Sequence, residues 1–407
     1  MSTQDFDIII VGAGIAGSSL AVALSNTSLR IAIIEAQPLR SDQPELNDSV
    51  DNFDPRVSAL TAASQQFFEQ QNVWSAMVQQ RVSPYQHMHV WDGDGTASID
   101  FDADEINQPC LGHIVENRVT VFALQQRLRQ AANIQIVDGV KLTELDQAEN
   151  QGEERRRIVL DDGRQLTASL LVAADGAQSI LREKAGFQLR QWEYGHNGIV
   201  ATVRMEKTHQ ATAWQRFMPE GPLAMLPLET SDGSRQLCSI VWSAKTELAD
   251  ELMQQSDEQF CRRLERALES RLGKVEAISS RFSFPLKQRH ATDYTKPGLA
   301  LVADAAHTIH PLAGQGINIG LKDVAALAEE IIRGQHRGLN PGHASVLSRY
   351  QRRRKGDNLA MMLGMEGFKR LFAETALPVR WARNAGMRWV DQVTPLKNRI
   401  VRQAMGL

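Results

Sequence analysis

The stretch Asp7-Ile-Ile-Ile-Val-Gly-Ala-Gly-Ile-Ala-Gly17 decides how the chain begins to fold. Its first half is a continuous apolar run of the kind found in buried parallel strands. Glycines then break the strand, and helical apolar spacing follows from Ser18 to Leu24. Gly12 suits a tight turn, Gly14 lets a pyrophosphate approach the backbone, and Gly17 lets the helix pack against the strand.

A second strand completes this unit and ends in an acid. Arg30-Ile-Ala-Ile-Ile-Glu35 is apolar, and Glu35 is placed to accept hydrogen bonds from a ribose hydroxyl. A glycine motif between a strand and a helix, with an acid ending the next strand, predicts a dinucleotide-binding βαβ unit. Because an acid at Glu35 disfavours a 2′-phosphate, FAD or NAD fits this site and bound NADP does not.

A second glycine-rich segment, His310-Pro-Leu-Ala-Gly-Gln-Gly-Ile-Asn-Ile-Gly-Leu-Lys-Asp323, distinguishes between these cofactors. It follows a buried-looking strand, at whose end Asp304 is placed to accept hydrogen bonds from the ribityl hydroxyls of a flavin. A helix begins near Asn318, and its N-terminal amides favour negative charge such as that of a reduced flavin. The segment therefore predicts a flavin. Three of its residues let the backbone approach a flat ligand closely: Gly314, Gly316 and Gly320.

Bulk properties limit the class of protein. A chain of 407 residues, 43% hydrophobic and 23% charged, is long for one core and ordinary for a soluble protein of two domains. A net charge of −3 gives no pull toward nucleic acid, and no apolar run approaches the roughly 20 residues of a membrane span. The cysteines Cys110, Cys238 and Cys261 lack metal-ligand spacing, and we expect reduced thiols in a cytoplasmic protein.

The order of strands and helices predicts an α/β fold in which one domain interrupts another. Pro55–Ala59 is expected to open a helix, Val115–Ala131 to be helical, and Gln188–Pro285 to be strand-rich with one helix near Asp257–Leu272. The expected FAD-binding domain is discontinuous and Rossmann-like, and the inserted substrate domain is an antiparallel sheet. The expected limits are 1–84, 106–187 and 286–330 for the first domain, 85–105 and 188–285 for the second, and 331–407 for a helical C-terminal region.

The chain resembles the flavoprotein aromatic hydroxylases of the para-hydroxybenzoate hydroxylase fold, and within them the ubiquinone-biosynthesis hydroxylases. The resemblance runs from Asp7 to the C-terminus. One departure is Ala303, where members of the family usually carry glycine before the aspartate. Besides the first glycine motif and Glu35, the resemblance rests on Arg56-Val-Ser-Ala59, Gly112-His-Ile-Val-Glu-Asn117, Asp175-Gly176 with Arg182, and His310–Asp323.

The resemblance implies a bound FAD, with NADH or NADPH as a transient reductant. The reduced flavin and O₂ would form a C4a-hydroperoxide that hydroxylates an electron-rich phenol, with water kept out. No metal is expected, and a metal pair of His307 and His310 is disfavoured beside a flavin. No catalytic acid or base is assigned, although Tyr85 and Tyr194 are able to hydrogen-bond a phenol. The implied cofactor-binding residues are Gly12, Gly14, Gly17, Glu35, Arg56, Arg118, Asp304, Pro311, Gly314, Gln315, Gly316 and Asn318.

The implied substrate is a polyprenylated phenol, with C5 hydroxylation favoured and C6 or C1 hydroxylation as alternatives. C-terminal residues resemble the C5 enzyme, whereas Trp214-Gln-Arg-Phe217 and Gly221-Pro222 resemble the C6 enzyme. Another flavin aromatic hydroxylase and a non-catalytic flavoprotein scaffold are the remaining alternatives. A flavin halogenase is disfavoured because Trp192, Trp214 and Trp242 do not form its W-x-W-x-I-P signature. An NAD-dependent dehydrogenase would leave His310–Asp323 without a purpose.

The C-terminal region is basic. Between Gln351 and Leu407 the chain has twelve Lys and Arg and four Asp and Glu, interleaved with apolar residues. This pattern indicates either a solvated face or a docking surface for anionic lipid or a biosynthetic assembly, which would hold a cytoplasmic protein at the periphery of the inner membrane. The basic residues are Arg352, Arg353, Arg354, Lys355, Lys369, Arg370, Arg380, Arg383, Arg388, Lys397, Arg399 and Arg402.

Overall fold

A mixed sheet with a parallel centre forms the first half of the protein. The structure is a computed structural model that describes residues 4–40, 42–150, 153–308, 316–374 and 376–407. Within these residues the sheet has eight strands, and its centre has the order β19-β11-β1-β2-β8. The strands are β1 (Gln4–Val11), β2 (Ile31–Glu35), β8 (Ile134–Asp138), β9 (Leu142–Asn150), β10 (Glu153–Leu160), β11 (Gln165–Ala173), β18 (Thr295–Lys296) and β19 (Leu299–Leu301).

Helices cover this sheet because its central strands are apolar on both faces. Ile8, Ile9 and Ile10 of β1 are completely buried. Helix α1 (Ile15–Ala23) contacts both α4 (Asn117–Arg129) and α8 (Gly316–Gln335). The predicted βαβ unit is therefore present, and the fold is the expected α/β arrangement.

A second sheet forms the other half and is mostly antiparallel, with one parallel pair between β5 and β13. Helices α6 (Thr246–Gln254) and α7 (Asp257–Ala267) pack on it through Leu252, Phe260 and Leu264. Its strands are β5 (His87–Asp92), β6 (Ser98–Asp102), β12 (Leu189–Met205), β13 (Thr212–Phe217), β14 (Leu223–Leu228), β15 (Leu237–Lys245), β16 (Val275–Ile278), β17 (Phe282–Ala291) and β20 (His307–Thr308).

A small third sheet lies between the two halves. Its strands have the order β3 (Val57–Leu60), β7 (Gly112–Glu116) and β4 (Ser83–Tyr85). Helices α2 (Ala62–Gln70) and α3 (Trp74–Gln80) connect β3 to β4, and α5 (Ile180–Lys184) follows β11. The short 3-10 turns are η1 (Val50–Asn52), η2 (Asp104–Ile106) and η3 (Ala303–Ala305).

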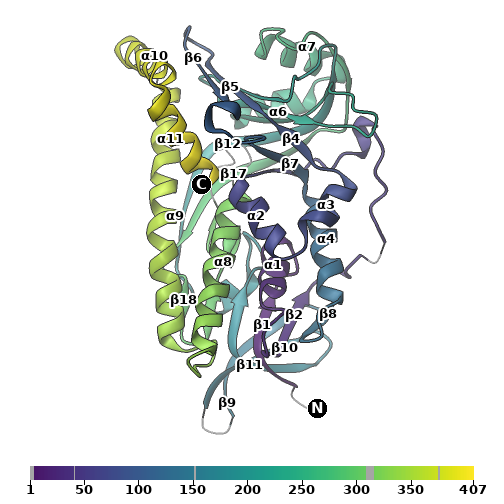
Figure 1. The fold of residues 1–407 in the computed structure, drawn as a ribbon, viewed down its shortest axis with the longest axis vertical. Coiled ribbons are helices and arrows are strands. Elements are labelled where there is room, and N and C mark those ends of the chain that lie inside the picture. Colours follow the sequence, from purple (N-terminus) through teal and green to yellow (C-terminus); the bar gives the residue numbers. More distant parts are fainter. Residues whose placement is uncertain (1–3, 41, 151–152, 309–315, 375) are drawn as a thin grey trace.

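The chain ends in helices, as expected. Helix α9 (Ala344–Ala373) packs along α8, and α10 (Leu377–Gln392) and α11 (Thr394–Met405) follow it. Figure 1 shows an elongated molecule, with the first sheet in the lower half, the second in the upper half, and α9 running along one side. The two terminal helices lie at the upper end, where α10 contacts β6.

Several local expectations were wrong. Pro55–Ala59 does not open a helix; Val57–Leu60 forms β3, and α2 begins at Ala62 behind Thr61, whose hydroxyl caps it. Val115 and Glu116 belong to β7, so the predicted helix begins only at Asn117. The second domain contains α6 as well as the expected α7. Short apolar segments fit a strand as well as a helix, and pairing with β7 decides the conformation of β3.

The predicted domain limits stay a prediction, but the strands divide in a similar way. Strands β5 and β6, from the predicted 85–105 segment, join the strands of the 188–285 segment in one sheet. The chain therefore leaves the first half twice and returns to it. This crossing places strand ends from both sheets around one cleft.

Candidate functional site

A cleft of about 1000 Å³ opens at the carboxyl ends of the parallel strands. Such crevices are where open α/β sheets bind ligands. Arg289 and Lys287 reach the cleft from β17 of the second sheet. Six of the residues predicted to bind the cofactor line this cleft together: Gly12, Gly14, Glu35, Arg56, Asp304 and Gly316.

The first glycine loop shows why each of its glycines is needed. Gly12 has φ +103°, and a Cβ there would lie 2.5 Å from the carbonyl oxygen of Ala174. A Cβ at Gly17 would collide with the carbonyl oxygen of Gly12, so α1 packs closely on the loop. Around Gly14, in contrast, a Cβ would meet no described protein atom within 4 Å. Gly14 thus leaves room for a ligand group at the N-terminus of α1.

Glu35 fixes this loop from the end of β2. Its Oε2 accepts a hydrogen bond of 2.7 Å from the Ala13 amide, and its Oε1 accepts one of 3.1 Å from the Gln37 amide. The carboxylate therefore holds the loop while facing the cleft. Its predicted bond to a ribose hydroxyl stays a prediction.

Asp304 lies at the opposite end of the cleft, in η3. Its side chain is open to the cleft, but the walls of the cleft surround it. Because these walls reduce the hydration of the carboxyl group, they raise its pKa. Ala303 before it has φ +51°, in the left-handed region, and this is the position where the family usually carries glycine. The Ala303 amide donates a hydrogen bond of 3.1 Å to Asp323 Oδ2, which fixes the turn that presents Asp304.

Asp323 is the centre of a buried polar network beneath this turn. His307 Nε2 shares a hydrogen bond with Oδ2, while Arg354 Nε and Asn358 Nδ2 donate to Oδ1 at 2.8 and 3.0 Å. Burial alone would raise the pKa of Asp323, but His307 and Arg354 outweigh it and the pKa is lowered. His307 is thus held by a carboxylate, and His310 lies outside the described residues.

Arg56 is held at the cleft by a second network, which contains Glu116. Glu116 Oε2 accepts a hydrogen bond of 2.7 Å from the Asp54 amide, and Asp54 Oδ1 accepts one of 2.9 Å from the Arg56 amide. Glu116 is almost completely buried and pairs with Arg81 at 2.6 Å and with Arg118 at 2.8 Å. The backbone at Arg56 is therefore rigid, while its side chain is exposed to the cleft.

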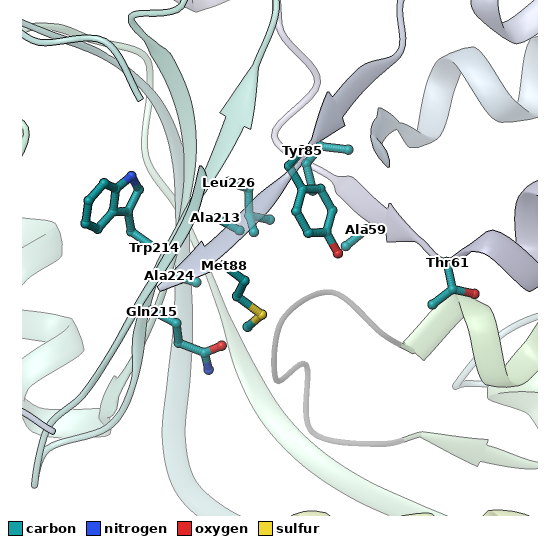
Figure 2. A pocket seen from close by; sticks show the side chains of 10 residues that line it. Ala59, Thr61, Tyr85, Met88, Ala213, Trp214, Gln215, Ala224 and Leu226 are labelled. Atoms are coloured by element: carbon teal, nitrogen blue, oxygen red, sulfur yellow. The ribbon is translucent and has the colours of Figure 1, made fainter. Parts of the chain in front are cut away.

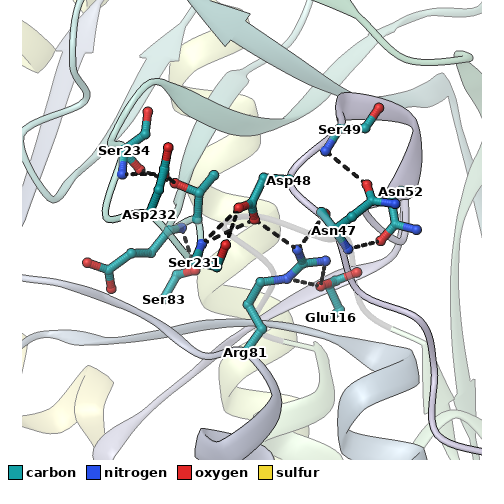
Figure 3. Close-up of polar contacts among 12 residues, drawn as sticks. Asn47, Asp48, Ser49, Asn52, Arg81, Ser83, Glu116, Ser231, Asp232 and Ser234 are labelled. Atoms are coloured by element: carbon teal, nitrogen blue, oxygen red, sulfur yellow. Dashed lines mark hydrogen bonds and ion pairs between the residues drawn. The ribbon is translucent and has the colours of Figure 1, made fainter.

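The same network joins the loop before Arg56 to the second sheet. Figure 3 shows the Arg81 guanidinium between Asp48 and Glu116, with Ser231 bonded to Asp48 on the far side. Arg118, predicted to border the cofactor, donates to Glu116 and to the carbonyl of Asn52. Its side chain supports the loop and is not among the residues that line the cleft.

The start of α8 is described from Gly316 onward, so the predicted residues Pro311, Gly314 and Gln315 lie outside the described residues. The side-chain amide of Asn318 links α8 to β3 and α2. Its Nδ2 donates a hydrogen bond of 2.7 Å to the Ala59 carbonyl, and its Oδ1 accepts one of 2.7 Å from Ser64 Oγ. Asn318 therefore fixes where α8 begins through its side chain. Any contact with a flavin would come from its backbone.

A smaller, mainly apolar pocket lies beyond the cleft, and β3 leads from one to the other. Val57 and Ser58 line the cleft, whereas Ala59 and then Thr61 line the pocket. Figure 2 shows the Tyr85 hydroxyl on the side of Ala59. Burial, and to a lesser extent Cys110, raises the pKa of Tyr85 to about 12, so its hydroxyl stays protonated at neutral pH. The remaining lining residues are Met88, Ile114, Ala213, Trp214, Gln215, Ala224 and Leu226.

The cleft fits the two ends of an FAD. The open position at Gly14 and the N-terminus of α1 suit a pyrophosphate. Carboxylates at Glu35 and Asp304 suit sugar and ribityl hydroxyls, and Arg56 supplies positive charge between them. A further acceptor, Asp175 Oδ1, is buried at the cleft without a hydrogen-bond partner among the described residues.

Sequence reasoning missed part of this cleft. Asp175 and Gly176 contributed to the resemblance but were not predicted to bind the cofactor, although both line the cleft after β11. Arg289 and Lys287 carried no local signal, because they come from the other sheet.

A comparison with protein families matches residues 5–360 to the model described as FAD binding domain. The chain is similar over its whole length to the 3-demethoxyubiquinol 3-hydroxylase of Escherichia coli, with 36% identity and 100% of both chains covered. It is 35% identical to the ubiquinone hydroxylase UbiL of Rhodospirillum rubrum, over 98% of this chain and 89% of that one. The mitochondrial ubiquinone biosynthesis monooxygenase COQ6 of Xenopus tropicalis is 32% identical, over 97% and 92%.

Solved structures show the same fold at low sequence identity. The p-nitrophenol 4-monooxygenase PnpA of Pseudomonas putida has a TM-score of 0.78 at 19% identity, over 100% of this chain and 99% of that one. PqsL of Pseudomonas aeruginosa, a probable FAD-dependent monooxygenase, has a TM-score of 0.77 at 20% identity, over 94% and 99%.

Proposed function

We propose that this chain hydroxylates the ring of a polyprenylated phenol or quinol on the route to ubiquinone. The premise is that it belongs to the FAD binding domain family, and within it to the FAD-dependent monooxygenases that include the ubiquinone-pathway hydroxylases. The observation that carries this proposal is the position of the pocket. Strand β3 leads directly from the FAD cleft to a pocket with apolar walls and a phenol donor at Tyr85.

The cleft residues bind and orient the cofactor in this account. Gly14 leaves space for the pyrophosphate, Glu35 and Asp304 accept hydrogen bonds from hydroxyls at the two ends, and Arg56 balances phosphate charge. FAD reduced by NADH or NADPH supplies the activated oxygen from O₂ that the reaction needs.

The pocket residues hold the ring and exclude water. Ala59, Ile114 and Leu226 give walls without polar side chains, so water gains few hydrogen bonds there. The Tyr85 hydroxyl, protonated at neutral pH, donates to the oxygen of the substrate ring, and Gln215 provides a second polar group. The pocket has a volume of about 40 Å³. A benzene-sized cavity is about 150 Å³, so Met88, a flexible side chain in the wall, moves when the ring enters.

Two ring positions have support. The C-terminal residues resemble the enzyme that hydroxylates C5 of a 2-polyprenylphenol. Identity of 36% over the full length favours the activity of the E. coli relative, which is 3-hydroxylation of a demethoxyubiquinol. The lipid that accumulates in a deletion strain separates these candidates, because the substrate of the missing step is the one that accumulates.

Purified protein tests the proposal itself. We expect it to oxidise NADH or NADPH faster when a short-chain demethoxyubiquinol or 2-prenylphenol is added, and to release a product with one more oxygen atom. If bound FAD turns over while the ring compound is recovered unchanged, the substrate assignment is wrong, and another flavin aromatic hydroxylase or a non-catalytic flavoprotein is left.

The polyprenyl chain also implies contact with a membrane. No helix of the described residues is long and apolar enough to cross one. We therefore propose peripheral association with the cytoplasmic face of the inner membrane.

A further inference from the structure

Helix α10 faces the solvent with its apolar side. Leu377, Trp381 and Trp389 have exposed fractions of 75%, 77% and 58%. Successive residues of an α-helix are turned by about 100°, so these three side chains lie within a sector of about 120° on one side of α10, which we name the tryptophan face. Water-exposed indoles of this extent cost free energy unless a partner covers them.

A buried ion pair holds the helix in this orientation. Arg383, on the opposite side of α10, pairs with Asp92 at the end of β5 at 2.7 Å, and both side chains are almost fully buried. Asn384 Nδ2 donates to the same carboxylate at 2.8 Å. Phe372 stacks on Phe217 at 4.2 Å and closes the junction between α9 and the second sheet. The outward direction of the tryptophans is therefore built into the packing.

The basic patch expected from the sequence is largely neutralised. Arg353, Arg354 and Lys355 pair with acids of other segments, and so do Arg380, Arg383 and Lys397. The side chain of Lys369 lies outside the described part of the chain. The exposed Arg370 also pairs with an acid, Glu366, at 2.7 Å. The exposed cations of α10 and α11 are Arg388, Arg399 and Arg402.

Charge complementarity indicates what covers this face. Arg388 lies two turns after Trp381 on the same exposed side of α10, and the charged residues of α10 and α11 that are exposed are basic. Helices that lie in a lipid headgroup region are typically rich both in tryptophan, on the face that enters the lipid, and in basic residues, on the face that stays polar. A positively charged surface favours anionic lipid.

Helix α10, which carries the tryptophan face, is linked through the fold to the substrate pocket. Strand β5 connects them: Asp92 anchors α10, and Met88 of the same strand lines the pocket. Met88 packs with Phe217, Phe372 and Met387, the apolar cluster under α10. A helix lying on a bilayer would therefore place the pocket near the lipid that dissolves a polyprenyl chain.

We propose that the tryptophan face of α10 docks on the surface of an anionic lipid bilayer and delivers the membrane-dissolved substrate to the pocket along β5. The delivery step rests on the proposed function, whereas the docking step does not. The proposed partner of the tryptophan face is lipid. Self-association of two copies through this face would contradict the proposal.

Vesicle flotation of the full-length holoenzyme tests the docking. The probes are vesicles of phosphatidylcholine alone and of phosphatidylcholine mixed with phosphatidylglycerol. We expect the wild type to float with the mixed vesicles. The partition coefficient of Trp381→Ser/Trp389→Ser should be lower by a factor of about ten or more, since two apolar contacts are lost. The matched control is Trp192→Ser, which removes a half-exposed tryptophan from β12 and should float like the wild type.

Three results would overturn the docking: equal flotation of wild type and double variant, no flotation of the wild type with either vesicle, or a wild-type dimer that the double variant abolishes without any lipid binding. The delivery step is read separately. The double variant should keep its FAD content and its rate on a short-chain substrate, but lose rate on a long-chain substrate in vesicles. Lipid binding without any hydroxylation would remove the proposed function and leave the docking intact.

Discussion

Ala303 and Gly320 face each other across the turn that presents Asp304. A Cβ at Gly320 would lie 2.7 Å from the Cβ of Ala303, so the methyl group of one residue occupies the space that the other leaves free. Ala303 also has φ +51°, which is strained for a residue with a Cβ. The turn beside the ribityl end of the cleft therefore carries strain that a glycine at 303 would remove.

We expect Ala303→Gly to raise the free energy of unfolding by about 1 kcal/mol, because relief of the left-handed conformation exceeds the entropy cost of glycine. Gly320→Ala should lower it by about 1–3 kcal/mol, through overpacking. In the Ala303→Gly background the loss at Gly320→Ala should become smaller. Urea denaturation of the four proteins measures this coupling. The control is Ala305→Gly, in the same turn but without a positive φ, which should lower the free energy of unfolding. Additive effects of Ala303→Gly and Gly320→Ala would contradict the proposed contact between the two residues.

Asp323→Asn should lower the free energy of unfolding by about 3–5 kcal/mol at neutral pH, because it leaves the buried Arg354 without its carboxylate. The pKa of Asp323 is lowered in the folded state, so its stabilisation is present above its unfolded pKa of about 4 and is lost as the pH falls through the folded pKa. The difference between wild type and variant should thus shrink in acid. Asp357→Asn, which removes an exposed partner of the same arginine, should cost less than about 1 kcal/mol. A difference that grows in acid would refute this assignment.

Gly14→Val and Gly17→Ala should separate cofactor binding from folding. At Gly14 the added side chain points into open space, so the apoprotein should fold normally but fail to retain FAD. At Gly17 the added methyl collides with the carbonyl of Gly12, so the protein itself should be destabilised. Flavin content and unfolding curves of both variants check this. Full flavin retention by Gly14→Val would show that the pyrophosphate lies elsewhere.

Asp304→Ala should weaken FAD binding by about 1–3 kcal/mol, the scale of a lost partner to buried hydroxyls. Burial raises the pKa of this carboxyl in the folded apoprotein, so the apoprotein binds the proton more tightly than the unfolded chain does and loses stability as the pH rises through that range. Asp304→Asn, which carries no charge, should therefore leave the apoprotein at least as stable as the wild type at neutral pH. Fluorescence titration with FAD measures the affinity, and unchanged affinity in Asp304→Ala would exclude the ribityl role.

The sequence was most informative where a local motif carries the structure. The βαβ unit around Gly12 and Glu35 follows from apolar strands and glycine geometry, which neighbouring residues determine. The same holds for the helical C-terminus. β3 was mistaken for a helix because a segment of four residues is too short to show a periodicity, and only its pairing with β7 selects the strand.

Long-range contacts explain the rest. The ion pairs Arg383–Asp92 and Lys397–Glu105 join residues almost 300 positions apart, so the C-terminal region looked like a free basic patch. The Asp323 network and the Glu116 network likewise combine residues from distant segments. Part of the segment His310–Asp323, which carried the strongest flavin signal in the sequence, is not among the described residues. The contacts of residues 310–315 therefore stay a prediction.

The most direct test of the central claim is a coupled assay of the purified yellow protein under labelled O₂, with a short-chain demethoxyubiquinol or 2-prenylphenol and NADH or NADPH. The account predicts release of FAD, not FMN, on denaturation, and a hydroxylated ring that carries one oxygen atom from O₂ for each reductant consumed. A protein that binds no FAD, or one whose reductant is consumed entirely for hydrogen peroxide with every candidate ring left unchanged, would contradict it.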